Sequence, residues 1–278
     1  MGRVVLLGRP NSGKSTLLNA LIGENLSMVS AKPQSTWTPV IGVRTDAEVQ
    51  LVFEDPPGII DPTQAMHDAL IGSVRKAVSR AHAALYLVPC DVAVEQLDTV
   101  VPPGVVVKCP SLIVRSKADD EDYTATEGVA VSAHTGRGIP ELLEWCRRWA
   151  PLREFAYPPD EIGTQPVRFF AAEYVREAVF EHVGDELPYA TAVEVDEFRE
   201  GSAPIYIRMT AYVERESQKG MLIGKGGTML KAIGAMARVR LEHLLGEKVY
   251  LDLWVKVKPK WRKNTQALRE FGYLRDED

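Results

Sequence analysis

The sequence of 278 residues contains little cysteine and little histidine, and both are scattered. No two of the three cysteines have the spacing of a metal-binding pair. They are Cys90, Cys109 and Cys146. An odd, scattered set is typical of reduced thiols in a cytosol and argues against a disulfide framework. The five histidines are too far apart along the chain to favour a metal site built from them.

Long apolar runs are also absent. Val4–Leu7 is apolar, but this run stops at Gly8, whereas a membrane span needs about 20 apolar residues and a signal peptide needs a longer apolar core. The sequence has no internal repeat and no low-complexity tract. We therefore expect a cytoplasmic globular protein whose length suits one large or two modest domains.

Charge is distributed unevenly along the chain. The formal net charge is −5, yet residues 208–263 contain thirteen Lys and Arg against five Asp and Glu. A basic C-terminal segment on an acidic body indicates an anionic partner. A solvated charged surface is the alternative that charge alone leaves open.

The first half alternates short apolar runs, rich in Val, Leu and Ile, with helical patterns. Continuous runs of this kind are typical of strands buried on both faces of a sheet. The runs are Val4–Leu7, Val49–Phe53, Ala84–Val88, Leu112–Val114 and Val129–Val131. One helix is predicted over Ser15–Ile22, ended by Gly23, and another over Leu142–Trp149, with Pro140 in its first turn. This pattern predicts an α/β domain with a mostly parallel sheet and flanking helices.

The alternation of apolar runs and helical patterns ends at Tyr157–Asp160, where two consecutive prolines mark the best domain boundary. We assign residues 1–156 to the first domain, 157–166 to a linker and 167–278 to the second domain.

The second domain has a different periodicity. Ile205–Val213 and Val249–Val257 alternate apolar and polar residues, as half-buried strands of a sheet with one open face do. Two sets of apolar residues recur at helical spacing. The first set is Phe170, Tyr174 and Ala178, and the second is Leu230, Ile233, Ala237, Leu241 and Leu244. We therefore predict a smaller α+β domain.

A phosphate-binding motif follows the first apolar run. Gly8–Ser15 matches G-x-x-x-x-G-K-S and stands between a strand and a helix, as the motif requires. Its glycines let backbone N–H groups turn toward phosphate oxygens, and the helix N-terminus adds partial positive charge. Lys14 would reach the β- and γ-phosphates, and the Ser15 hydroxyl would bind Mg²⁺. The predicted nucleotide contacts here are Asn11, Ser12, Gly13, Lys14, Ser15 and Thr16.

Two further segments contain candidates for sensing the γ-phosphate. In Asp55–Gly58, which reads D-P-P-G after a predicted strand, Asp55 would hold Mg²⁺ through water and the Gly58 N–H would contact the phosphate. Thr36, in the loop 32–39, is placed to close on Mg²⁺ and the γ-phosphate. For Asp55–Gly58 the alternative is a common turn, and for Thr36 it is an ordinary loop threonine. The predicted metal ligands are Ser15, Thr36 and Asp55, and the predicted catalytic residues are Lys14, Thr36 and Gly58.

The base is predicted to be guanine. Ser116–Asp119 reads S-K-A-D after a predicted strand and takes the place of the N-K-x-D signature of GTPases. Asp119 can accept hydrogen bonds from the N1–H and the exocyclic amino group of guanine, and adenine has no such pair of donors. This argues against a P-loop kinase or ATPase. The predicted base contacts are Ser116, Lys117 and Asp119, with Ser132, Ala133 and His134 from a later S-A-x loop.

A second glycine-rich loop lies in the second domain. Gly224–Gly227 reads G-K-G-G and fits the G-x-x-G loop with which KH domains clamp four nucleotides of single-stranded RNA. Glycine is needed there because a side chain would hold the phosphate chain away, and another glycine-rich turn is the alternative. The predicted RNA contacts are Lys219, Met221, Ile223, Gly224, Lys225, Gly226, Gly227, Lys231 and Arg238.

The basic segment around Trp261 is a further candidate for phosphate or stacking contacts. A solvated strand end is the alternative. Its basic residues are Lys256, Lys258, Lys260, Arg262 and Lys263.

Together these motifs resemble the Era family of bacterial GTPases over nearly the whole chain. The matching segments, in the family's order, are GRPNSGKSTLLNALIG, Pro33–Thr36, DPPG, SKAD, SAHTGRGIPEL, YPPDE, Asp185–Tyr189, KGMLIGKGG and Val255–Trp261. The resemblance implies a P-loop GTPase domain followed by a type II KH domain, with GTP/GDP and Mg²⁺ as ligands. It also implies binding near the 3′ end of 16S rRNA during assembly of the 30S subunit, and an occasional peripheral association with the membrane. We expect a monomer.

This sequence departs from the family pattern in its base-reading and switch segments. Ser116 stands where the family has Asn, and its shorter side chain cannot reproduce both hydrogen bonds of an amide, a loss of about 0.5–1.5 kcal/mol. Trp37–Pro39 replaces the usual basic residues after the switch threonine, and Pro57 stiffens the D-P-P-G turn. Only twelve residues separate Asp119 from Ser132, so we expect a helix in this segment to be lost or reduced.

No side chain can be named as the group that orients the attacking water, since Ile59 follows Gly58, as in the Era family. We therefore expect slow intrinsic hydrolysis, which a bound monovalent cation or ribosomal partners would raise. The first hypothesis is a GTP-hydrolysing switch that acts on ribosomal RNA. The second is an RNA-binding assembly chaperone that binds guanine nucleotide and hydrolyses it poorly or not at all. The intact Lys14, Ser15, Asp55 and Gly58 favour the first.

Overall fold

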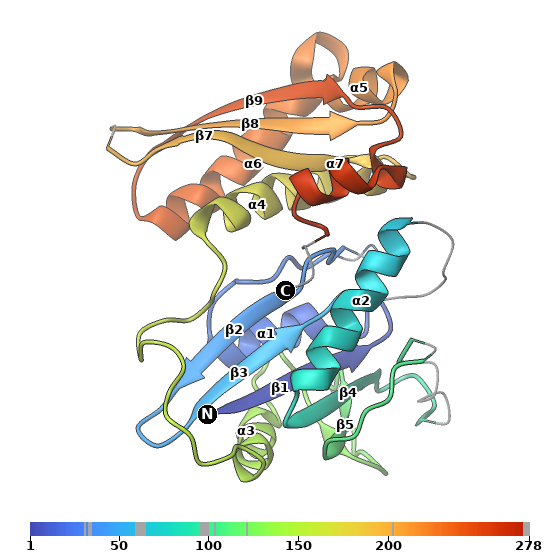
Figure 1. Ribbon diagram of the computed structural model, residues 1–278, viewed down its shortest axis with the longest axis vertical. Coiled ribbons are helices and arrows are strands. Elements are labelled where there is room, and N and C mark those ends of the chain that lie inside the picture. The colour runs from blue at the N-terminus through green and yellow to red at the C-terminus, as the bar shows by residue number, and fades with distance from the viewer. Residues whose placement is uncertain are drawn as a thin grey trace. The chain divides into compact units, whose positions relative to one another are not determined.

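The computed structural model describes residues 1–30, 32, 35–58, 65–94, 100–102, 104–120, 122–201 and 203–274. For the most part the chain divides between Thr164 and Gln165 into two compact units, each with its own sheet and helices (Figure 1). This division lies within the segment 157–166. Pro33, Gln34 and Ile59 lie outside the described residues.

The described part of the first unit contains a six-stranded sheet in the order β2-β3-β1-β4-β5-β6. All neighbouring strands are parallel except β2 and β3, which confirms the predicted mostly parallel sheet. Since the parallel strands end at one edge of the sheet, the three motifs that follow β1, β3 and β5 meet there. The strands are β1 (Gly2–Gly8), β2 (Val40–Thr45), β3 (Gln50–Asp55), β4 (Ala83–Pro89), β5 (Ser111–Ser116) and β6 (Val129–Ala130).

Helices cover both faces of this sheet (Figure 1). On one face α2 (Ala65–Arg80) packs its apolar residues against Val5 and Leu7 of β1. The helices α1 (Lys14–Ile22) and α3 (Ile139–Arg148) contact each other and β1. Alternate residues of β1 therefore face different helices, which explains why the whole run Val4–Leu7 is buried. Both helices predicted from the sequence are present.

The strand β2 was not predicted from the sequence, because Gly42 and Arg44 interrupt its apolar pattern. A Cβ at Gly42 would lie only 2.6 Å from Cγ1 of Ile22, so the glycine allows α1 to pack closely against this strand. Arg44 donates from Nη1 to the Leu21 carbonyl oxygen at 2.7 Å. Packing against α1 therefore accommodates the two residues of β2 that interrupt its otherwise β-branched sequence.

The first residues of the segment 157–166 hydrogen bond to the first unit. The Gln50 side chain donates to the Tyr157 carbonyl oxygen at 2.9 Å and accepts from the Tyr157 N–H at 3.1 Å. The Val43 N–H donates to the Ile162 carbonyl oxygen at 2.8 Å. The first unit thus extends beyond residue 156.

The described part of the second unit contains a three-stranded sheet in the order β7-β8-β9, with β7 antiparallel and β9 parallel to β8. The helices α4 and α6 pack side by side, with Ile233, Ala237 and Leu241 of α6 fully buried. Leu244, predicted for the same face, is 37% exposed because it lies in the last turn of the helix. The elements are α4 (Val167–His182), η2 (Pro188–Ala190), β7 (Ala192–Arg199), β8 (Ile205–Val213), α5 (Glu216–Ile223), η3 (Lys225–Gly227), α6 (Thr228–Leu245), β9 (Val249–Val257), η4 (Trp261–Lys263) and α7 (Thr265–Glu270).

The two predicted strands of this unit, β8 and β9, alternate as expected. The residues Ile205, Ile207 and Met209 are buried, whereas Arg208 between them is exposed. The second unit is thus a small α+β domain. Among the described residues, no helix combines the length and the apolar character needed to span a bilayer.

Candidate functional site

The loop that joins β1 to α1 forms one wall of a cavity of about 330 Å³. Gly8 ends β1, and a Cβ there would lie 2.3 Å from Oγ of Ser12, so the loop can close only over a glycine. Gly13 has φ 90°, in the left-handed region that glycine tolerates. Of the sequence-predicted nucleotide and switch residues, the cavity is lined by Asn11, Gly13, Lys14, Ser15, Thr16, Thr36, Gly58 and Lys117.

The Lys14 side chain is buried in the phosphate-binding loop. Its Nζ donates to the carbonyl oxygens of Gly8 at 3.1 Å and Arg9 at 3.3 Å. Burial lowers the pKa of Lys14, and the Asp55 carboxylate opposes this shift. A cation that has already lost most of its water is suited to binding an anion, because little further desolvation is needed.

Oxygen atoms predicted to bind the metal lie together beside the cavity. The Ser15 hydroxyl donates to Oδ2 of Asp55 at 2.7 Å, and it lies 3.2 Å from Oγ1 of Thr36. Asp55 is fully buried, and its Oδ1 has no hydrogen-bond partner among the described residues. Burial raises the pKa of Asp55, whereas Lys14 and two hydroxyl donors lower it. A buried carboxylate beside two hydroxyls is a set of hard oxygen ligands of the kind that Mg²⁺ prefers.

Ser27 belongs to this set although the sequence analysis did not include it. Its hydroxyl donates to Oδ2 of Asp55 at 3.1 Å. Asn19 fixes Ser27 by accepting from its N–H and donating to its carbonyl oxygen, both at 2.8 Å. No motif marks Ser27, since only the fold brings residue 27 next to residue 55.

The two switch segments meet the phosphate-binding loop. A Cβ at Gly58 would lie 3.0 Å from Nζ of Lys14 and 3.1 Å from the backbone N of Pro10. Gly58 is therefore a position of close backbone approach, as its predicted role requires. Trp37, next to Thr36, is buried, so the residue that replaces a basic family residue serves as a core anchor for the switch threonine.

The predicted base-reading residues are joined to one another and to the phosphate-binding loop. The Ser116 hydroxyl donates to the Ser12 carbonyl oxygen at 2.7 Å. Ser116 thus makes one hydrogen bond at the position where the family's amide would make two. The Ser132 hydroxyl donates to Oδ1 of Asp119 at 2.5 Å and accepts from the Thr135 N–H at 3.1 Å.

Of the predicted base contacts, Lys117 lines the cavity. The others, Ser116, Asp119, Ser132, Ala133 and His134, are not among the described residues that line it. His134 is exposed and Ala133 is half-buried. The segment between Asp119 and Ser132 contains turns and no helix among its described residues, which confirms the expected loss of a helix there.

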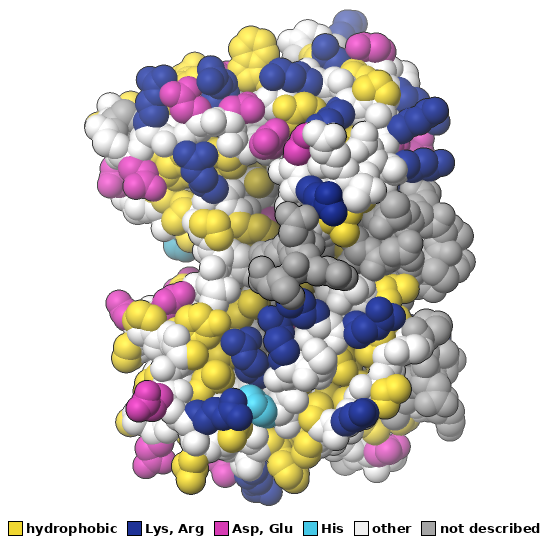
Figure 2. Space-filling model, in the orientation of Figure 1, with side chains coloured by type: hydrophobic (Ala, Val, Ile, Leu, Met, Phe, Trp, Pro, Cys, Tyr) yellow, Lys and Arg dark blue, Asp and Glu magenta, His cyan; other side chains and the backbone are white. Residues whose placement is uncertain are grey.

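The G-K-G-G loop joins α5 to α6 in the second unit. Gly224 has φ 73° and ψ 173°, and Gly226 and Gly227 have φ 62° and 79°. Met221, Lys225, Lys231 and Arg238 are exposed, whereas Lys219 and Ile223 are half-buried. The loop and the helix that follows it thus expose basic side chains, and Figure 2 shows Lys and Arg side chains mixed with acidic ones over the second unit.

Gly224→Ala is expected to destabilise the second unit by about 1–3 kcal/mol. The backbone of Gly224 is in a region that only glycine occupies readily, and a Cβ would lie 2.7 Å from Cβ of Met229. Gly234→Ala is the matched control, because Gly234 lies within α6 and a Cβ there meets nothing within 4 Å. This control should stabilise by about 1 kcal/mol. Urea unfolding followed by circular dichroism measures both, and equal effects of the two changes would contradict the prediction.

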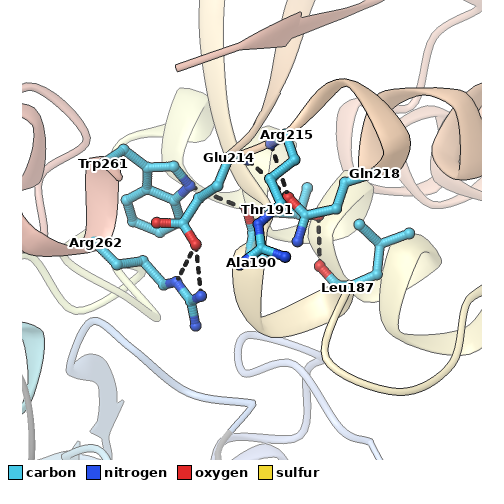
Figure 3. A network of polar contacts seen from close by, with 8 residues as sticks. All are labelled: Leu187, Ala190, Thr191, Glu214, Arg215, Gln218, Trp261 and Arg262. Carbon is cyan, nitrogen blue, oxygen red and sulfur yellow. Dashed lines mark hydrogen bonds and ion pairs between the residues drawn. The ribbon is translucent and has the colours of Figure 1, made fainter. Parts of the chain in front are cut away.

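Part of the basic segment around Trp261 makes internal contacts, and Figure 3 draws those of Trp261 and Arg262. Trp261 is fully buried and donates from Nε1 to the Ala190 carbonyl oxygen at 3.0 Å. Arg262 donates to Oε2 of Glu214 from Nε at 3.2 Å and from Nη2 at 2.6 Å. Lys258 forms an ion pair with Glu270. The prediction of Trp261 as a stacking residue is therefore wrong, because the C-terminal segment uses it as core; Lys256, Lys260 and Lys263 remain exposed.

Comparisons with known proteins bear on both units. Residues 3–114 match a family described as 50S ribosome-binding GTPase, and residues 186–262 match the KH domain family. GTPase Era from Geobacter metallireducens is 38% identical, with 98% of this chain and 97% of that protein covered. GTPase Era from Carboxydothermus hydrogenoformans is 36% identical with the same coverage. This chain belongs to the Era GTPase family.

Solved Era structures match the whole fold. An Era variant from Aquifex aeolicus bound to GDP·AlF4⁻ is 33% identical, with a TM-score of 0.90 and 99% of each chain covered. A structure of Era with MgGDPNP and nucleotides 1506–1542 of 16S ribosomal RNA is 32% identical, again with a TM-score of 0.90 and 99% of each chain covered. The predicted family and the predicted order of a P-loop GTPase domain and a KH domain are therefore confirmed.

Proposed function

We propose that this chain is a GTP-hydrolysing switch that binds 16S rRNA through its second unit and assists assembly of the 30S ribosomal subunit. The observation that carries this proposal is the meeting of Lys14, Ser15, Thr36 and Gly58 around one cavity, with Asp55 hydrogen-bonded to Ser15 behind it. Thr36 and Gly58 lie on loops outside the P-loop. Contacts of these loops with a γ-phosphate would order them in the GTP state, whereas GDP has no γ-phosphate to contact them.

Guanine nucleotide and Mg²⁺ are the proposed ligands of the first unit. Ser15 and Thr36 would bind Mg²⁺ through their hydroxyls and Asp55 through water, and the ion would neutralise charge on the phosphate oxygens. Lys14 would donate to β- and γ-phosphate oxygens, and the Gly58 N–H would contact the γ-phosphate. Asp119, fixed by the Ser132 hydroxyl at 2.5 Å, would accept from N1–H and the amino group of guanine.

The second unit is proposed to hold single-stranded RNA against the G-K-G-G loop. The Era complex with MgGDPNP and a 16S rRNA fragment supports this proposal through its similarity over the whole chain. The exposed Lys225 in the loop and the exposed Lys231 and Arg238 on α6 would neutralise backbone phosphates. The partner is thus proposed to be the 3′ end of 16S rRNA within the 30S subunit.

Slow intrinsic turnover is part of the proposal. Pro57 stiffens the turn before Gly58, and Trp37 anchors the loop of Thr36 in the core, so both switches have limited freedom to rearrange. Three further points stay predictions. A monovalent cation at the switch would be tested by the dependence of turnover on salt. A monomeric state would be tested by sedimentation, and a cytoplasmic location with a peripheral membrane fraction by cell fractionation.

Multiple-turnover release of phosphate from GTP tests the proposed function. We expect slow release by the full-length protein alone and faster release with an RNA containing nucleotides 1506–1542 of 16S rRNA. An RNA of the same length and shuffled sequence is the control, since electrostatic attraction alone would act on both. GTP binding without phosphate release, while the RNA still binds, would favour the RNA-binding scaffold instead.

A further inference from the structure

The segment between Asp119 and Ser132 must hold its shape without a helix. Its first residue is the proposed guanine acceptor, and the Ser132 hydroxyl at its other end binds that acceptor. Such a short connection between two base-reading loops would be mobile unless side chains fix it. The described residues show two arginines that do so, one from each flank.

Arg115 fixes the segment from β5. It precedes Ser116 directly and is 6% exposed. Its Nη2 donates to the carbonyl oxygens of Cys90 at 2.9 Å and Val92 at 2.8 Å, and its Nε donates to the Tyr123 hydroxyl at 3.0 Å. A buried guanidinium is costly unless its donors are used; Nε and Nη2 are used in this way, whereas the buried Nη1 has no partner among the described residues. This arginine therefore ties the loop after β4 to Tyr123.

Arg137 fixes the same segment from the opposite flank. It donates from Nη1 to the Asp120 carbonyl oxygen at 2.7 Å and from Nη2 to the Tyr123 carbonyl oxygen at 2.6 Å. Its own carbonyl oxygen accepts from the Ser132 N–H at 3.0 Å. Tyr123 is thus held at its hydroxyl by Arg115 and at its carbonyl by Arg137, and the carbonyl group of Asp120, the residue after Asp119, is held as well.

We propose that Arg115, Tyr123 and Arg137 form a latch that positions the Asp119 carboxylate for guanine in place of the missing helix. This inference rests on the proposed base-reading role of Asp119. The latch fixes the loop before the nucleotide arrives, so the entropy of ordering this loop does not weaken binding. GTP and GDP carry the same base, so the latch affects both nucleotides alike. The three are positioning residues.

The first test compares nucleotide affinities of full-length variants by calorimetry. Arg137→Ala should lower the affinities for GDP and for GDPNP by the same factor of about 10. The rate of phosphate release at saturating GTP should stay unchanged. Arg137→Lys should restore part of the loss, because an ammonium can still donate to one carbonyl. Tyr123→Phe, which keeps the ring, should weaken both nucleotides about threefold. Arg75→Ala, at an exposed position on α2, is the matched control and should change nothing.

A double-mutant cycle separates positioning of Asp119 from general loosening of the unit. In an Asp119→Ala background, adding Arg137→Ala should cost less than twofold in GDP affinity, since the acceptor to be positioned is gone. An unchanged tenfold loss in that background would overturn the latch. Normal GDP affinity of Arg137→Ala alone would also overturn it. If Asp119→Ala itself leaves the preference for GDP over ADP intact, the proposed base-reading role fails, independently of the arginine results.

Discussion

Lys14→Ala is expected to lower multiple-turnover phosphate release from GTP by about 100- to 1000-fold. The Lys14 ammonium is buried at the mouth of the P-loop, where Gly8 and Arg9 carbonyl oxygens hold it and Gly58 approaches it closely. In this poorly hydrated position its charge acts strongly on phosphate oxygens. Because negative charge builds up on the bridging oxygen of the leaving group during cleavage, the loss should be larger in turnover than in GDP affinity.

Lys76→Ala is the matched control for this change. Lys76 is exposed on α2, and it is not among the described residues that line the cavity. Its turnover should equal that of the unchanged protein, whereas the loss of turnover in Lys14→Ala excludes a contaminating GTPase. Circular dichroism of both variants shows whether the fold is retained. Turnover of Lys14→Ala above about one third of the unchanged rate would mean that the cavity is not the site of hydrolysis.

The parts of the first unit that the sequence predicts are those that local residues specify. β1, β3 and β4 contain continuous apolar runs, because both of their faces are buried, whereas β5 is buried only in its second half. The phosphate-binding loop follows from its glycines, since Gly8 and Gly13 meet steric demands inside the loop itself. Such features need no knowledge of distant residues, which is why the motif and its neighbouring strands could be assigned together.

Features that depend on distant residues could not be predicted in this way. Ser27 contacts Asp55 only because the fold brings the two residues together. In the sequence Arg115 is simply a charged residue at the end of a strand, and its hydrogen bonds to carbonyl oxygens could not be predicted. The strand β7 was not predicted because its acidic residues and a bulge between Val195 and Glu197 disturb the alternation. The role of Trp261 was predicted wrongly, because its basic neighbours indicate an exposed segment.

These cases share a physical cause. Hydrogen bonds between side chains and backbone carbonyls depend on positions in space. Since every residue has a carbonyl group, the sequence does not show which one a side chain binds. Ser116 shows this clearly: its type alone indicates a lost hydrogen bond, whereas its hydroxyl binds the Ser12 carbonyl oxygen at 2.7 Å. The effect of this substitution on guanine affinity should therefore be small relative to that of removing Asp119.

Trp261→Ala is expected to destabilise the second unit by about 3–5 kcal/mol. The indole is fully buried, contacts the rings of Phe271 and Tyr273 at centroid distances of 5.4 Å and 5.9 Å, and donates to the Ala190 carbonyl oxygen. Next to it, Arg262 binds Glu214 before the start of α5 (Figure 3). Loss of the indole therefore removes packing from the residues that follow α7, and it loosens the segment whose Arg262 binds Glu214.

Trp254→Ala on β9 is the matched control, because this indole is 55% exposed and its removal leaves no buried cavity. Its effect should stay below about 1 kcal/mol. Trp261→Phe keeps most of the packing but leaves the Ala190 carbonyl oxygen without its donor, so we expect a loss of about 1–3 kcal/mol. Urea unfolding with and without GDP and Mg²⁺ assigns the transitions, since ligands of the first unit should shift only its own transition. Equally small losses in the free energy of unfolding for Trp261→Ala and Trp254→Ala would mean that Trp261 is exposed. Its predicted role in stacking on RNA would then stand.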